Sequence, residues 1–303
     1  MKISHTPRMK AWLLAGCGAV LLFQPAALAT DGLEGVEAVA SKVSKDYVRI
    51  KMADGSFQNE SYAFGPGGNW GGEIRDLSIE KLNFMDVARV IAVPLATQRY
   101  VPARDPKTTR LLIMVYWGTT AVPPPYEEDP IYYNYLQALD EYRILLDEGY
   151  PDEANNVLSS GLHQLDIENR RRDLVDFRNA GMIGYAASGL VGTDYGKYIS
   201  HNAIGVEQRT EVAEIEENRY FVVLMAYDFQ LLWKQKKRKL LWETRFSINE
   251  RHNQFDKALP LMAQYAARFF GQPSDGLVKA RLQEGRVEIG DPTLIEFLTG
   301  PKK

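Results

Sequence analysis

Residues 220–248 read YFVVLMAYDFQLLWKQKKRKLLWETRFSI and contain two predicted strands joined by a cationic segment. Tyr220 to Tyr227 is a continuous run of apolar and aromatic residues, which is typical of a buried strand. Lys239 to Ile248 alternates instead, as a strand with one buried face does. The residues that share that face are Leu240, Trp242, Thr244, Phe246 and Ile248. Two such strands, so close in sequence, predict an antiparallel hairpin.

The cationic segment between these strands has two interpretations. Its five cations are Lys234, Lys236, Lys237, Arg238 and Lys239. Lysines at a hairpin tip keep it solvated and discourage association between sheets. A short basic run can also attract an anionic lipid, a nucleic acid or a cell-wall polymer. Nucleic acid is the least expected of these partners, because the rest of the chain is acidic.

A third strand and two helices flank this region in the sequence. Leu111 to Trp117 is wholly apolar and ends at Gly118, which predicts a strand buried on both faces. Helical spacing of apolar residues recurs from Phe84 to Tyr100, around Pro94, and from Phe255 to Ala266, around Pro260. Asn83 or Asp86 can cap the first helix, and Gly271 supplies a stop after the second.

A helical hairpin is predicted as an insertion at about residues 126–180. Asp129-Pro130 offers an N-cap followed by proline, and Pro151 begins a second amphipathic segment. Tyr132, Tyr135, Leu136, Leu139, Tyr142 and Leu146 form the expected inner stripe of the first helix. Residues 180–218 resemble an irregular return path. The fold class is therefore α+β, an antiparallel-rich sheet packed by two helices, with an inserted helical hairpin.

Glycine-rich segments mark the N-terminal part of the chain. Asp54-Gly55 between two β-prone runs predicts a hairpin turn. The stretch GPGGNWGG at 65–72 lacks the spacing of a phosphate-binding loop. We expect a flexible loop there.

The first 29 residues are typical of an export signal. Lys2, Arg8 and Lys10 precede the apolar run from Ala11 to Phe23, and cleavage is expected before Thr30. Residues 30–303 would then form a single domain, periplasmic or extracellular. Two alternatives stay open: a lipoprotein, whose lipidated Cys17 would tether the chain to a membrane, and an uncleaved anchor.

Cleavage would change the charge and the cysteine content. The leader contains three basic and no acidic residues, so the formal net charge changes from −3 to −6. It also contains Cys17, the only cysteine, so no disulfide or thiol chemistry is expected afterwards. A cysteine-free chain suits an oxidising compartment.

Catalytic motifs are absent from the sequence. His163, His201 and His252 lie far apart, and no zinc-protease, nucleophile-elbow or calcium-loop spacing occurs. We therefore expect no cofactor and no metal. A hydrolase acting on a cell wall or glycan could use paired carboxylates, such as Asp228 with Glu243 across the hairpin.

The order of these elements carries a resemblance. A helix leading to RLLIMVYWG, then YFVVLMAYDF, then Lys239-Leu240-Leu241-Trp242 and a final helix resembles a family of uncharacterised bacterial envelope proteins, many of them lipoproteins. The resemblance covers about half the chain, around 84–118 and 219–271. It departs from the family in the helical insertion and in Arg238, where a turn glycine is typical. It implies an exported, non-enzymatic domain, and no catalytic residue carries over.

The sequence thus predicts an exported binding or scaffold protein that contacts an envelope component through the insertion or the basic turn. That component could be a protein, an anionic lipid or a cell-wall polymer. The alternatives are the hydrolase and a structural subunit of a homo-oligomer.

Overall fold

The computed structural model describes residues 35–70, 76–186 and 206–282, so the predicted export signal, Cys17 and His201 lie outside the described residues. Seven strands form one mixed sheet in the order β3-β2-β4-β5-β6-β1-β7. The strands are β1 (Gly35–Val43), β2 (Glu60–Trp70), β3 (Tyr100–Pro102), β4 (Leu111–Thr119), β5 (Arg219–Asp228), β6 (Leu240–Asn249) and β7 (Leu277–Leu282). Only β2 pairs in parallel, with β3 and with β4. The α+β class and the antiparallel-rich sheet are confirmed.

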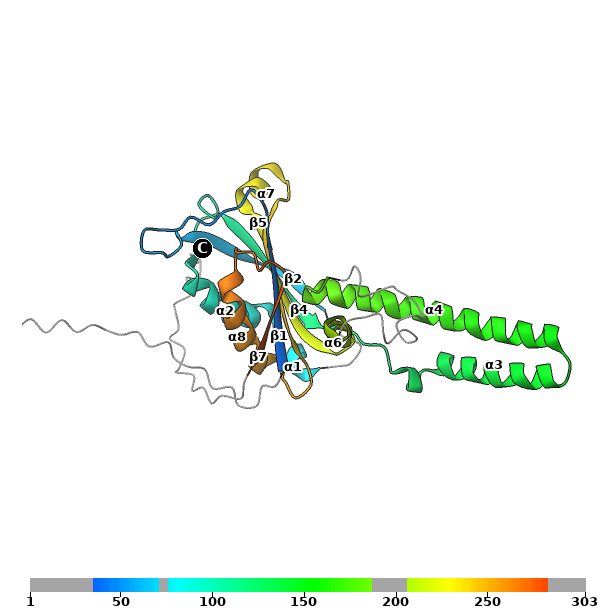
Figure 1. Ribbon diagram of the computed structural model, residues 1–303. Coiled ribbons are helices and arrows are strands. Elements are labelled where there is room, and N and C mark those ends of the chain that lie inside the picture. The colour runs from blue at the N-terminus through cyan, green and yellow to red at the C-terminus, as the bar shows by residue number, and fades with distance from the viewer. Residues whose placement is uncertain (1–34, 71–75, 187–205, 283–303) are drawn as a thin grey trace, which may run out of the picture.

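One face of the sheet is covered by α2 (Phe84–Thr97) and α8 (Phe255–Ala266), as predicted (Figure 1). Asn83 caps α2 in a capping box with Asp86. Trp242 from β6 packs against Phe270, just after the short turn η2 (Ala267–Phe269). This layer is the main core. The four-residue helix α1 (Leu77–Glu80) lies at its border.

The opposite face of the sheet is covered less completely. Ile183 at the end of α4 (Pro151–Ile183), together with Tyr185 and Ile215, forms a smaller cluster there. Ile215 ends α6 (Val206–Ile215), a helix in the part of the chain that we expected to be irregular. Because this cover is partial, β4 is not buried on both faces: its odd-numbered residues from 111 to 117 are buried, and those between them are half-buried.

The glycine-rich stretch is not a loop, at least through Trp70. Gly65 to Trp70 continue β2 in parallel with β4. The glycines make room for the neighbouring strand, because a Cβ atom at Gly67 would lie 2.6 Å from the Tyr116 ring. Gly71 and Gly72 lie outside the described residues. The expectation of a flexible loop was therefore wrong for the described part of this stretch.

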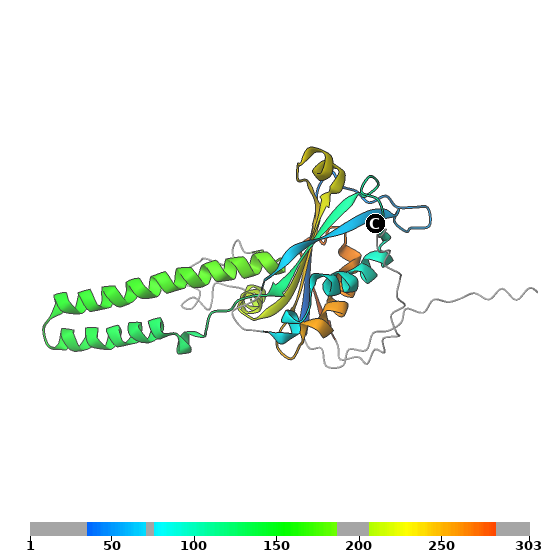
Figure 2. The ribbon, with the colours of Figure 1, turned by 180° about the vertical axis from the view of Figure 1, so that it is seen from behind.

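The inserted hairpin consists of η1 (Tyr126–Glu128), α3 (Pro130–Asp147) and α4, and it projects well away from the sheet (Figure 2). Asp129 caps α3 and binds Arg172 of α4 at 2.5 Å. Burial opposes ionisation of Asp129, but hydrogen bonds from Arg172 and from the Ile131 amide hold its pKa below the ordinary value. Of the expected inner stripe, four residues are half-buried, while Leu136 and Leu146 are exposed.

The outer part of this hairpin contributes nothing to either core cluster, and this predicts an expendable segment. Replacing residues 136–162 with a short Gly-Ser linker should leave the unfolding temperature unchanged within about 2–4 °C. Ala138, Ala154 and Gly161 are buried there, and all three belong to the α3–α4 pair itself. Ile183→Ala, at the base of the hairpin, should cost about 2–5 kcal/mol. Thermal unfolding would measure both, and loss of the sheet on shortening would contradict the prediction.

Candidate functional site: the basic end of the sheet

Three connections meet at one end of the sheet. β1 ends, β2 begins, β4 begins, β5 ends and β6 begins at this end, because Tyr62 pairs with Leu111 and Leu111 pairs with Asp228. We call residues 44–60, 98–110 and 228–239 the basic end. They carry twelve Lys and Arg residues against five Asp and Glu. The chain as a whole has a net charge of −3, so positive charge is strongly concentrated here.

A short helix, α7 (Phe229–Gln235), occupies the connection between β5 and β6 (Figure 1). Asp228 caps it by accepting a hydrogen bond from the Leu231 amide at 2.9 Å. The strands pair antiparallel as predicted, but the cationic segment is not the tip of a tight hairpin. It forms the last turn of α7 and the segment that connects this helix to β6. The aromatic and aliphatic residues between Phe229 and Trp233 follow helical spacing, a signal that the sequence analysis did not use.

The structure brings the five predicted cations together on this protruding connection. Lys234 and Lys236 are exposed, and Lys236 adopts φ 59° where α7 ends. Lys239 binds Asp46 at 3.0 Å and so joins the connection to the 44–60 segment. Among the described residues, Lys234, Lys237 and Arg238 make no hydrogen bond or ion pair, and all three side chains are exposed. Their charge is available to a partner.

Further cations reach this end through the topology of the sheet. Lys45 and Lys51 lie on the 44–60 segment, and Arg104 and Lys107 on the connection before β4, all exposed. Gln230 of α7 donates to the carbonyls of Pro106 and Thr109, so the second connection is fixed beside the third. The cations of the basic end, from Lys45 to Lys239, are up to 194 positions apart in sequence. No local pattern could have grouped them.

We call residues 47–58 the ribbon, because residues 50–52 pair with 56–58 in two short strands, turned at Asp54-Gly55 as predicted. Gly55 has φ 81°, and the Met52 amide donates to the Ser56 carbonyl at 2.7 Å. Tyr47 and Arg49 point inward and are buried. The ribbon is therefore attached to the sheet by its polar and aromatic side.

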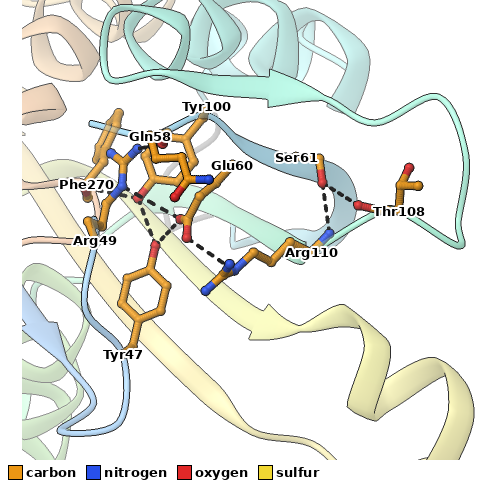
Figure 3. A network of polar contacts seen from close by, with 9 residues as sticks. All are labelled: Tyr47, Arg49, Gln58, Glu60, Ser61, Tyr100, Thr108, Arg110 and Phe270. Carbon is orange, nitrogen blue, oxygen red and sulfur yellow. Dashed lines mark hydrogen bonds and ion pairs between the residues drawn. The ribbon is translucent and has the colours of Figure 1, made fainter. Parts of the chain in front are cut away.

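A buried cluster of polar side chains makes this attachment (Figure 3). The Glu60 carboxylate lies 3.7 Å from Nε of Arg49 and 3.2 Å from Nε of Arg110, and it accepts a short hydrogen bond from Tyr47. The Arg49 guanidinium lies 4.0 Å from the centre of the Tyr100 ring, and it donates to a backbone carbonyl of the ribbon at 3.2 Å. Such contacts offset the cost of burying its charge.

The two tyrosines of this cluster are locked in their neutral form. Burial raises the pKa of both Tyr47 and Tyr100 well above the ordinary value, and the neighbouring Glu60 carboxylate raises each of them further. The Tyr100 hydroxyl donates to the Phe270 carbonyl at 3.2 Å. The two hydroxyls therefore stay protonated near neutral pH and serve as fixed supports of the ribbon.

The predicted carboxylate pair does not form. Asp228 lies opposite Lys239, whereas Glu243 pairs with Met225, three residues further along β5. Three residues of strand span about 10 Å. Asp228 is occupied as the cap of α7, and Glu243 binds Arg245 at 2.8 Å. The pair that the hydrolase alternative suggested is therefore not formed, because α7 and a bulge displace the two carboxylates from each other.

A shallow pocket of about 490 Å³ lies elsewhere, near α1. The Asp76 carboxylate in it accepts from Tyr220 at 2.6 Å and from the Ser78 amide at 2.7 Å. Burial opposes ionisation, yet these bonds keep the pKa of Asp76 lowered. Burial and the Asp76 charge raise the pKa of Glu250. Asp76 already serves as the cap of α1 and the partner of Tyr220, so its hydrogen-bonding capacity is used within the fold.

The two histidines in the described part of the chain lie on the surface. His163 is exposed on α4, and His252 is exposed in a turn with φ 65°. Across residues 35–70, 76–186 and 206–282, no group of three or more metal-ligating side chains could hold an ion. In the same described ranges, no helix is long and apolar enough to cross a bilayer.

Comparison with known proteins leaves the function open. No protein-family model matches the chain, and no curated protein is similar to it in sequence. One similar solved structure is that of a PDZ domain protein from Parabacteroides distasonis, at 11% identity and a TM-score of 0.35. The match covers 81% of this chain and 39% of that chain, so this chain corresponds to well under half of that protein. The resemblance to envelope proteins stays a prediction.

Proposed function

We propose that this is an exported, non-enzymatic binding or scaffold protein of the cell envelope, and that its basic end binds a polyanionic surface. The proposal rests on one observation: three connections far apart in sequence place their cations at a single end of an otherwise acidic chain. The leader-like first 29 residues support an envelope location. Anionic lipid and cell-wall polymer share the negative charge that this end would recognise.

The exposed cations of the α7 connection supply the test. Lys236→Ser, Lys237→Ser and Arg238→Ser together should weaken binding roughly a hundredfold, because each cation near an anionic surface contributes about 1 kcal/mol. Residues 30–303 contain every described element and lack the apolar run that would itself bind lipid. Co-sedimentation with cell-wall sacculi and with phosphatidylglycerol vesicles, together with retention on a heparin column, would measure binding at low and high salt.

A charge-matched control separates the site from the net charge. Arg143, Arg170 and Lys257 are exposed cations on α3, α4 and α8, away from the basic end. Their triple serine variant removes the same charge and should bind as the wild type does. Equal losses in the two triple variants, or no binding to any of the three anionic surfaces, would contradict the proposal. High salt should release the wild type, since exposed charges are screened.

A further inference from the structure

The outward face of the 47–58 ribbon is apolar. Val48, Ile50 and Met52 are exposed to 73%, 56% and 51%, although each is an aliphatic side chain on an ordered ribbon. Their inward neighbours Tyr47 and Arg49 are buried, so strand alternation places the three on one outward face. A row of exposed aliphatic side chains on an edge ribbon is a liability unless something covers it.

The buried support prevents this row from turning inward. Rotating the ribbon to bury Val48 and Ile50 would expose Arg49 and remove it from Tyr100 and Glu60. Gly271 closes the cluster from the other side, because a Cβ atom there would lie 2.3 Å from the Tyr100 hydroxyl. The outward presentation of the apolar row is thus fixed by the fold.

Cations and an exposed aromatic side chain share the basic end with the apolar row. Lys45 and Lys51 are exposed on the same segment, and the Lys239–Asp46 ion pair ties it to the α7 connection. The helix α7 lies at the same end of the sheet (Figure 1), and its Trp233 is 42% exposed. Aliphatic side chains, Lys, Arg and tryptophan together are the composition of surfaces that lie in a lipid interface.

We propose that the partner of the basic end is an anionic lipid bilayer, and that Val48, Ile50 and Met52 insert at the boundary between head groups and acyl chains. This inference rests on the proposed function and narrows its partner. A hydrated cell-wall polymer would engage the cations and leave the aliphatic row in water. A bilayer satisfies both features at once, since its head groups carry the complementary charge and its interior accepts the apolar side chains.

Apolar variants distinguish a bilayer from a polymer. Val48→Ser, Ile50→Ser and Met52→Ser together should weaken binding to vesicles of phosphatidylglycerol and phosphatidylcholine roughly a hundredfold, from the lost burial of three side chains. Retention on heparin should not change, because no charge is altered. The matched control is Ile144→Ser, Leu146→Ser and Leu174→Ser on the exposed hairpin, which should leave vesicle binding unchanged.

Fluorescence quenching gives a second reading that does not depend on affinity. Residues 30–303 contain two exposed tryptophans, Trp233 at the basic end and Trp70 at the end of β2, where it pairs with Gly118 at the opposite end of the sheet. Lipids brominated near their carbonyl groups should quench the wild type. Trp233→Phe should remove most of the quenching, and Trp70→Phe should preserve it.

The possible outcomes separate this inference from the function on which it rests. Salt-sensitive binding to heparin or sacculi without vesicle binding, or vesicle binding that the Val48, Ile50 and Met52 variant retains, would overturn the lipid assignment alone. If the wild type formed a dimer in solution, the variant were a monomer and neither bound vesicles, the apolar row would be an interface with a second copy of the chain. Failure on every anionic surface would overturn both proposals.

Discussion

Glu60→Gln should destabilise the protein by about 3–5 kcal/mol, because it leaves a buried guanidinium without its carboxylate. The Arg49 side chain is fully buried and Glu60 nearly so, and water cannot replace the lost charge there. The amide keeps the shape of the side chain, so the loss is electrostatic. Urea unfolding would measure the change in the free energy of unfolding, and the unfolding temperature should fall by several degrees.

Two companion variants make this result specific to the buried pair. Asp140→Asn breaks an exposed pair with Arg143 on α3 and should cost less than about 1 kcal/mol. Glu60→Gln combined with Arg49→Met removes both charges and should recover part of the lost stability, because an apolar pair needs no compensation. A single Glu60→Gln variant as stable as the wild type, or a double variant with additive losses, would show that the two charges are not coupled.

In Glu60→Gln, the ribbon should open locally in addition to the loss of overall stability. The ribbon is held to the sheet mainly through Tyr47 and Arg49, so Glu60→Gln should speed hydrogen exchange at the Met52 and Gln58 amides, which bond within the ribbon. Amides of β5 in the centre of the sheet should follow global unfolding only. The cluster thus links stability to the presentation of the apolar row.

The sequence predicts the centre of this fold well and its edges poorly. β4, β5 and β6 carry long apolar or alternating runs, and α2 and α8 carry helical spacing with a recognisable cap or stop. β1 carries neither signal. Glu37 and Ser41 are polar yet buried within it. Ser41 forms a hydrogen bond with Thr244 at 2.8 Å, and this partner lies beside it only because β1 pairs with β6. Tertiary pairing overrides local pattern at such positions.

Some residues of the basic end can be identified from the sequence, and others only from the structure. The five cations of the α7 connection are contiguous, and the sequence identifies them directly. The pairing of Arg49 with Glu60 depends on how the ribbon folds back on itself. The gathering of Lys45 and Lys107 depends on strand order, which a parallel pairing of β2 with β4 sets. Alternation from Tyr47 to Met52 was visible in the sequence, but which side faces water follows from the buried cluster alone.

Glu37→Gln should make the protein more stable near neutral pH. The Glu37 side chain is fully buried in β1, and within the described residues neither carboxylate oxygen has a hydrogen-bond partner. Burial raises its pKa well above the ordinary value, and the attraction of Arg268 and Arg219 offsets only part of this effect. The folded state therefore holds a proton that the unfolded state releases above its own pKa of about 4.3.

The sign of the pH dependence follows from this difference in bound protons. Below about pH 4 both states are protonated and Glu37 has no net effect. Above that pH the unfolded state alone ionises, so the Glu37 contribution to stability falls by about 1.4 kcal/mol per pH unit until the folded pKa is reached. Glutamine cannot ionise, so the free energy of unfolding of Glu37→Gln does not fall for this reason. The unfolding free energies of the two proteins should coincide in acid and diverge as the pH rises.

Urea unfolding of the wild type and of Glu37→Gln from about pH 4 to about pH 7 isolates the effect, because all other groups titrate equally in both. Glu141→Gln on the exposed surface of α3 is the control, because it makes the same chemical change on a side chain that is not buried. A Glu37→Gln variant less stable than the wild type at neutral pH would mean that the carboxylate is ionised and paired in the folded protein. The expected stabilisation would instead place an uncompensated acid in β1, which explains why its sequence gives so weak a strand signal.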